Sequence, residues 1–272
     1  MKIYAERFDS ITAFAAHLAP HTGREGKYGN SSEETRATSW ALGMDWSQAL
    51  TMAKRGGDWP EGAAELQSID TAAATKDMAT MIAPELVNDV VGGAIDVPEY
   101  LIGAPECFLR MDEEAEQPRS MIRLAACVGA TADTSGHHML NRGRAILAAV
   151  DAYELQGYTV ELTAFMVCHR KGRMLYTAEI VLKQAGIPWD SSSVAFGLAH
   201  PAFSRRLGFK ALEIHPDAAW LSAESYGNGN MEKPEGFDIY FNYVTSGRGF
   251  TSPDEAIDTV KRTIREQTDT QL

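Results

Sequence analysis

The chain has 272 residues, 44% hydrophobic and 23% charged, which is typical of a globular protein with a buried core and excludes extensive disorder. Its 37 acidic and 25 basic residues give a net charge of −12, which opposes non-specific attraction to nucleic-acid phosphates. No apolar run reaches the roughly 18 to 20 residues of a membrane span, and the first residues lack a signal-peptide pattern, so we expect a cytoplasmic protein without a membrane partner.

The first 118 residues predict a helical N-terminal region. Between about residues 3 and 81, apolar side chains recur at helical spacing, as in Ile11, Phe14 and Leu18, and Asp45 can cap a second helix. Residues 84–118 contain four prolines, three glycines and no sustained periodicity. Either a domain boundary or a long surface loop fits this composition, and we place the change near residue 118.

Residues 119–272 predict an α/β domain. The pattern gives strands at residues 121–128, 158–166, 174–182, 209–214 and 237–243, and helices at residues 140–156, 194–207 and from 252 onward. Such alternation indicates a mostly parallel sheet with helices on both faces, and residues 174–182 are predicted to be its one antiparallel edge strand. Ligands of such sheets bind at the carboxyl ends of the strands, which points to the loop after residue 128.

That loop carries the sequence Asp-Thr-Ser-Gly-His-His-Met at residues 133–139. It resembles the D-x-S-x-S metal motif of von Willebrand factor A domains, and the order of elements over residues 119–268 is similar to that family. The resemblance implies a magnesium or other divalent cation, held by the aspartate, the serines and residues of later loops, whose open position takes a carboxylate of a protein partner.

The resemblance suggests Asp133, Ser135, His137 and Asp217 as metal ligands. His137 stands where the family has its second serine, and a nitrogen ligand there would favour softer metals. Asp217, after the predicted strand at residues 209–214, and the serines at 191–193 are candidates by their order along the chain. An N-cap turn at the start of the long helix explains Asp133 and Ser135 without a metal.

These features predict a non-enzymatic interaction protein that binds a protein partner through loops around Asp133, Ser191 and Asp217. A Trp-x-x-Gly element at residues 40–43 and a later Gly-x-Trp-x-Glu-Gly-like stretch loosely resemble uncharacterised bacteriophage proteins, which implies a phage-encoded protein in the host cytoplasm. An enzyme stays open, although no spacing marks a catalytic set.

The alternative is a single-stranded nucleic-acid-binding accessory protein of phage transcription or replication. Its contacts would be arginines and lysines that bind phosphates and tryptophans that stack on bases. The candidates are Arg142, Arg144, Arg170, Lys171, Arg173, Trp40 and Trp59. Without such a partner, short basic clusters like these and Arg205/Arg206 are solvated ends of elements.

Overall fold

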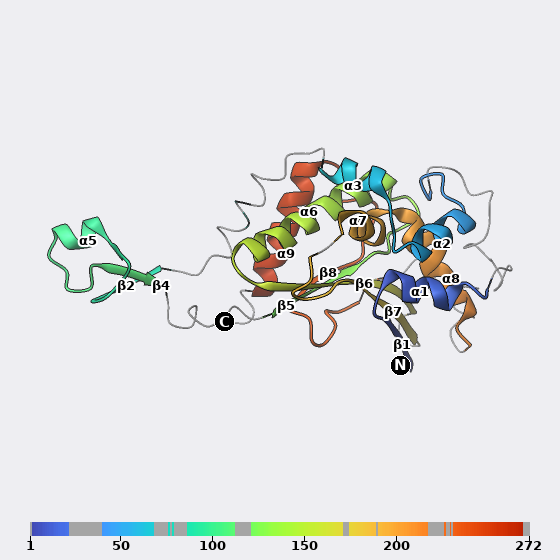
Figure 1. Ribbon diagram of the computed structural model, residues 1–272, viewed down its shortest axis with the longest axis horizontal. Helices are drawn as coiled ribbons and strands as arrows, with labels where there is room; N and C mark the ends of the chain where they lie inside the picture. Colours follow the sequence, from blue (N-terminus) through green and yellow to red (C-terminus); the bar gives the residue numbers. More distant parts are fainter. Residues whose placement is uncertain are drawn as a thin grey trace.

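A five-stranded sheet forms the centre of the molecule in the computed structural model (Figure 1). The structure describes residues 2–21, 40–67, 76, 78, 86–111, 121–170, 174–188, 190–216, 226, 229 and 231–268. The strand order is β1 (Lys2–Phe8), β7 (Met174–Lys183), β6 (Thr159–Arg170), β5 (Met121–Cys127) and β8 (Ile239–Phe241). Neighbouring strands are parallel except β6 and β7, so the predicted mixed α/β fold with a mostly parallel sheet is confirmed.

The strands follow from the side-chain alternation of the sequence. In β6, Val160, Leu162, Ala164 and Met166 point to the main core, while Phe165 and Val167 point to the opposite face. The adjacent β5 is apolar from Leu124 to its end at Cys127, where it is buried on both faces, with Leu124 and Ala125 fully covered.

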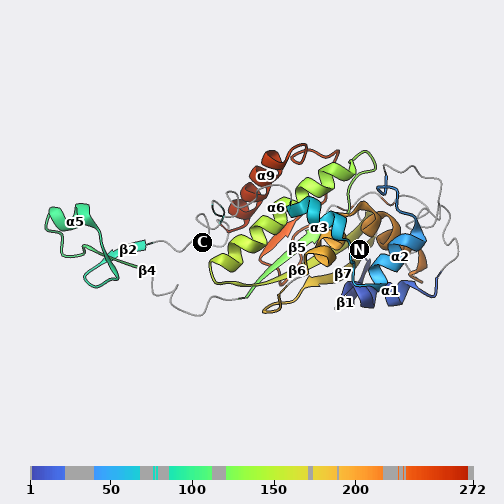
Figure 2. The ribbon, with the colours of Figure 1, turned by 45° about the horizontal axis from the view of Figure 1, so that its top comes forward.

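Helices cover one face of the sheet, as Figures 1 and 2 show. They are α1 (Ile11–Leu18), α2 (Trp46–Lys54), α3 (Pro60–Gln67), α6 (Gly136–Leu155), α7 (Ser191–Ala199), the π-helix η2 (Phe203–Gly208), α8 (Phe209–Ile214) and α9 (Pro253–Thr268). Residues from both sides of position 118 share this core, since Phe14 of α1 packs on Phe203 with ring centroids 5.8 Å apart.

The other face of the sheet differs from the predicted cover of helices. In the described part of the chain, its apolar cluster, which includes Cys127, Phe165 and Tyr240, packs against Met231, Phe237 and Tyr243 from the segments flanking β8. Phe165 and Phe237 meet edge to face at 5.2 Å. Of the residues that the structure describes, irregular segments rather than a helix therefore pack on this side.

Two predicted elements are wrong, and one is misplaced within the sheet. Residues 2–8 form strand β1 instead of starting a helical region, and β1 and β8, rather than β7, are the edge strands. The strand alternation of β1 was hidden because Glu6 lies on the inner face, where it accepts a 2.7 Å hydrogen bond from Tyr176, while apolar Ile3 is exposed.

Residues 209–214, predicted as a strand, form helix α8 as the continuation of η2. Short apolar runs do not distinguish a strand from a buried helix, and here even Lys210 and Glu213 are buried. The Lys210 ammonium lies 5.6 Å from the centre of the Trp46 ring, and Glu213 accepts a hydrogen bond from Tyr226.

A small antiparallel sheet stands apart from the main body in Figure 1. It contains β2 (Leu86–Asp89), β4 (Phe108–Met111) and β3 (Ala94–Ile95) in the order β2-β4-β3, with helix α5 (Val97–Leu101) between β3 and β4. We call residues 86–111 the projecting module. No described helix is long and apolar enough to cross a membrane.

Candidate binding site at the carboxyl edge of the sheet

The loops that follow β5 and β8 lie side by side at the carboxyl edge of the parallel strands. Ala130 forms a parallel bridge with Val244, and the Thr131 N–H donates to Val244 O at 3.0 Å. We call residues 128–135 and 244–247 the crest. Since both segments leave adjacent parallel strands, the sheet itself brings them together, as the sequence predicted for the loop after residue 128.

Two threonine side chains connect the halves of the crest. The Thr131 and Thr134 hydroxyl oxygens are 3.0 Å apart. Each also accepts a backbone N–H from the other loop: Ser246 donates to Thr131 Oγ1 at 2.7 Å, and Gly247 donates to Thr134 Oγ1 at 3.2 Å. These bonds satisfy polar groups that would otherwise be left unpaired and fix the relative position of the loops.

A buried arginine supports the crest from below. Arg205 of η2 is 2% exposed, and its guanidinium donates to Thr131 O at 2.8 Å and Thr134 O at 3.0 Å. It also donates to Trp40 O at 2.6 Å and lies over the Trp40 ring at 5.5 Å. Burial lowers the pKa of Arg205 to about 10, so the group stays charged at neutral pH. Arg205 thus joins the crest to the N-terminal part of the chain.

Asp133 is the exposed acidic group of the crest. Hydrogen bonds from the Thr131 and Ser246 side chains, with a smaller contribution from the charge of Arg205, hold the pKa of the Asp133 carboxyl below its usual value. Ser246 has a positive φ of 53°, an uncommon backbone conformation for a residue other than glycine. The crest therefore presents an ionised carboxylate to solvent, with hydroxyl groups beside it.

The other predicted metal ligands are used differently. The Ser135 hydroxyl caps helix α6 by accepting the His138 N–H at 3.3 Å, and His137 is exposed on the first turn of that helix. Asp217 lies outside the described residues, and the reasoning that placed it after a strand is wrong because α8 precedes it. Among the described residues, no three His, Cys, Asp or Glu side chains gather as a metal cluster.

The serines at 191–193 begin helix α7. Asp190 caps this helix by accepting from the Ser192 and Ser193 N–H groups and from the Ser193 hydroxyl, which holds its pKa down. Helix α7 follows β7, whose carboxyl end pairs at Lys183 with Leu162 near the start of β6. Because β7 is antiparallel to β6, these serines follow the end of the sheet opposite to the crest.

The described residues of the predicted nucleic-acid surface are mostly internal. Arg142 is 4% exposed and donates to the carbonyls of Phe241 and Asn242, and Arg144 is buried beside Asn141. Trp59 is buried and meets His200 edge to face at 4.5 Å. 

Trp40 is partly buried against Arg205 and Arg206. Lys171 and Arg173, and the side chain of Arg170, lie outside the described part of the chain. Arg205 and Arg206, interpreted from the sequence as solvated ends, are also buried.

Sequence reasoning missed Thr131, Arg205 and Ser246 as parts of the crest. Thr131 and Ser246 are 115 residues apart, and Arg205 is 74 residues from Thr131. The local signal was the pair Arg205 and Arg206, two charged residues between the apolar Phe203 and Leu207.

The fold and the crest define an α/β protein whose parallel strands end at a hydrogen-bonded edge that carries an exposed carboxylate. A model of the family described as "Domain of unknown function (DUF7192)" matches residues 1–267, and the chain belongs to this family. The match includes both the sheet and the projecting module. Comparisons with curated proteins and with solved structures found no match.

Proposed function

We propose that this chain is a non-enzymatic interaction protein that binds a protein partner at the crest, with Asp133 as the central recognition group. The observation that carries the proposal is an exposed carboxylate, Asp133, on a loop whose backbone is fixed by the bonds from the Ser246 N–H to Thr131 Oγ1 and from the buried Arg205 to Thr131 O. Such a rigid polar group binds with little loss of conformational entropy.

We propose further that a divalent cation, magnesium or manganese, bridges Asp133 and an acidic side chain of the partner. The carboxylate and the hydroxyls of Thr131 and Ser246 are oxygen ligands of the type that these hard cations prefer. This set replaces the one expected from the likeness to von Willebrand factor A domains, in which Ser135 and His137 were ligands. The likeness to that family and a phage origin remain part of the proposal.

A cation titration tests the metal-bearing form. Magnesium at tenfold its dissociation constant should stabilise the native chain by about 1.4 kcal/mol, because only the folded crest gathers the ligands. That corresponds to an increase of about 2 °C in the unfolding midpoint. Asp133→Ala should abolish the increase, whereas Asp254→Ala, which removes an exposed acid from the start of α9, should leave it intact. No response to magnesium, manganese or zinc would eliminate the cation.

The alternative of single-stranded nucleic-acid binding has weaker support. Three of its seven candidate residues, Arg142, Arg144 and Trp59, are buried, which removes these side chains from contact with phosphates or bases. A labelled oligonucleotide at low salt decides between the two proposals. If the protein slows the oligonucleotide in a gel and added salt abolishes this effect, nucleic-acid binding is favoured over binding of a protein partner at the crest.

A further inference from the structure

The projecting module has almost no core of its own. Among its described side chains, residues 88–109, Cys107 alone is buried, and α5 has no buried residue. Cys107 is a free thiol, so no disulfide stabilises the module. Units of fewer than about 40 residues usually need a disulfide, a metal or an association partner to be stable. The described residues supply neither a disulfide nor a metal site.

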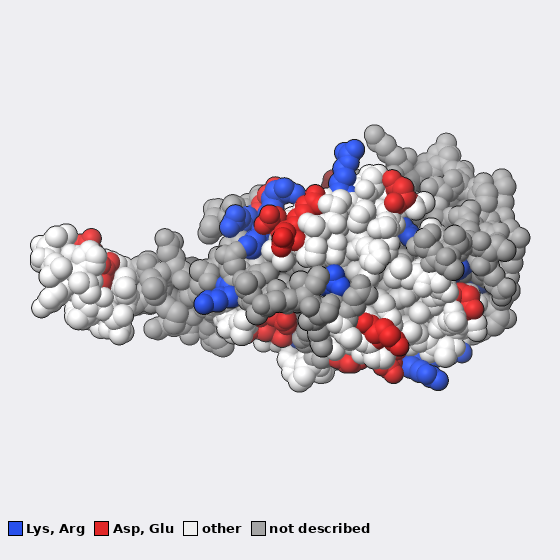
Figure 3. Space-filling view, turned by 90° about the horizontal axis from the view of Figure 1, so that it is seen from above, with Lys and Arg blue, Asp and Glu red and all other residues white. Residues whose placement is uncertain are grey.

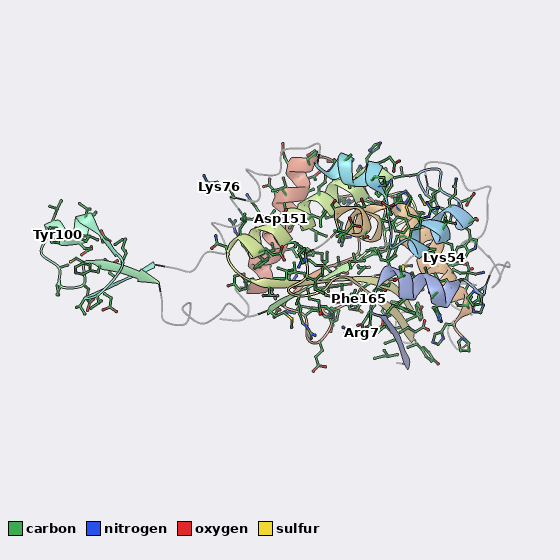
Figure 4. The ribbon with its side chains drawn as sticks, in the orientation of Figure 1. Arg7, Lys54, Lys76, Tyr100, Asp151 and Phe165 are labelled. Atoms are coloured by element: carbon green, nitrogen blue, oxygen red, sulfur yellow. The ribbon has the colours of Figure 1, made fainter. Side chains whose placement is uncertain are left out.

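Its large apolar side chains instead face solvent. Seven of the twelve exposed large apolar residues in the described chain lie between positions 90 and 102: Val90 56%, Val91 72%, Ile95 49%, Val97 58%, Tyr100 59%, Leu101 75% and Ile102 76%. Figure 4 labels Tyr100 on this module. Soluble monomers rarely expose apolar patches of more than a few hundred Å² unless these bind something.

The backbone that presents these side chains is well defined. Asp96 caps α5 by accepting the Glu99 N–H, and the Asp96 N–H donates to Cys107 O at 2.8 Å. Gly92 packs so closely on β4 that an added Cβ would lie 2.3 Å from Leu109 O. The apolar groups are therefore displayed on a fixed turn and helix.

All charged side chains described in the module are acidic. They are Asp89, Asp96, Glu99 and Glu106, and with Arg110 near its end the module, residues 86–111, has a net charge of −3. Figure 3 accordingly shows red and white atoms, and no blue atoms, on the visible face of the module. A partner that covers the apolar residues must approach through a negative field, which favours cationic surfaces.

We propose that the projecting module is a docking surface for a basic amphipathic helix of a partner protein. The apolar face of such a helix covers the side chains between Val90 and Ile102, and its lysines or arginines lie near Glu99 and Glu106. The same charges disfavour a second copy of this chain, which has an equally acidic module and a net charge of −12, and they disfavour an anionic membrane.

The test uses the full chain and two labelled peptides of about 18 residues, enough for five helical turns, one of leucine and lysine and the other of leucine and glutamate. Fluorescence anisotropy should show that the lysine peptide binds at least about tenfold more tightly, and that salt weakens its binding. Equal affinity for the two peptides, or no binding of the lysine peptide, would overturn the proposal.

Matched variants locate the binding. Leu101→Ser with Ile102→Ser should weaken binding of the lysine peptide by about tenfold or more, because both side chains would be buried in the complex. Leu155→Ser with Ile187→Ser removes side chains that are 69% and 53% exposed elsewhere and should change it less than about twofold. Equal losses in the two pairs would show that the peptide binds apolar surface without regard to the module.

Charge variants test whether peptide binding depends on the acidic side chains of the module. Glu99→Gln with Glu106→Gln should weaken binding of the lysine peptide about threefold or more, whereas the exposed pair Glu232→Gln with Glu235→Gln should not. Self-association that disappears in the Leu101/Ile102 variant, or binding to phosphatidylserine vesicles through these residues, would replace the proposed helix by a second copy or a membrane. Asp133→Ala should leave peptide binding unchanged, so failure at the crest and at the module are distinguishable.

Discussion

Replacing Arg205 by methionine tests whether this residue supports the crest. Methionine keeps much of the volume of the side chain but removes every donor. The carbonyls of Trp40, Thr131 and Thr134 then lose hydrogen bonds of 2.6, 2.8 and 3.0 Å at a site that is 2% exposed. The substitution therefore removes a connection between three segments of the chain while leaving the apolar packing nearly intact.

The expected loss of stability is about 4 kcal/mol. A buried carbonyl left without a donor costs about 1 to 3 kcal/mol. Thr131 O keeps the bond from the Thr134 N–H at 3.0 Å, so the total stays well below three times the upper value. Lysine should recover less than half of this loss, because one ammonium group cannot span three carbonyls in the planar geometry of a guanidinium.

Urea unfolding followed by circular dichroism measures the loss, and amide hydrogen exchange locates it. Exchange should accelerate most at the N–H groups of Ser246 and Gly247, which donate to the crest threonines. Arg7→Met is the control, since its 3.9 Å ion pair with Glu179 is half exposed and should contribute less than about 1 kcal/mol. A loss below about 1 kcal/mol in Arg205→Met, or one equal to the control, would refute the supporting role.

Two further predictions concern pH and steric fit. Burial lowers the pKa of His200 to about 4 in the folded chain. As pH falls from 6.5 to 4, His200 is therefore protonated in the unfolded chain before it is protonated in the folded one. About 3 kcal/mol of the stability present above pH 6.5 is lost in that range. Asp151, with its pKa raised to about 6 by burial, contributes in the opposite direction. Urea titrations across this range should therefore give a shallower loss in His200→Asn than in the native chain, and equal slopes would contradict the assignment. Gly247→Ala should cost about 2 kcal/mol more stability than Gly103→Ala in thermal unfolding. Both glycines have a positive φ, but only an added Cβ at Gly247 meets a side chain, since it would lie 1.9 Å from His138 Nδ1. Similar losses would mean that His138 moves aside.

The elements predicted correctly carry local signals. The strand β5 is a short apolar run, α6 ends before Gly157 with its φ of 83°, and the Ser252-Pro253 start of α9 provides both a cap and a favourable first residue. Each of these signals lies within a few residues of the element it defines, so a single sequence was sufficient.

The missed features depend on contacts between distant residues. Arg142 was interpreted as a surface group because its own helix gives no sign of its acceptors, the carbonyls of Phe241 and Asn242 about 100 residues later. The edge strand β1 escaped detection for a similar reason, since its inward Glu6 accepts a hydrogen bond from Tyr176, which is 170 residues away. The same limit applies to the crest, whose position was predicted but whose supporting residues were not.

The pairing of β1 with β7 has a consequence for synthesis on the ribosome. β1 leaves the exit tunnel before the other described strands, yet its partner in the ladder is about 170 positions later, as the Glu6–Tyr176 bond shows. Until β7 emerges, the backbone groups of β1 cannot form their native ladder, and contacts this remote slow folding. We therefore expect nascent chains that stop before β7 to expose an unpaired strand edge, the kind of surface that chaperones shield.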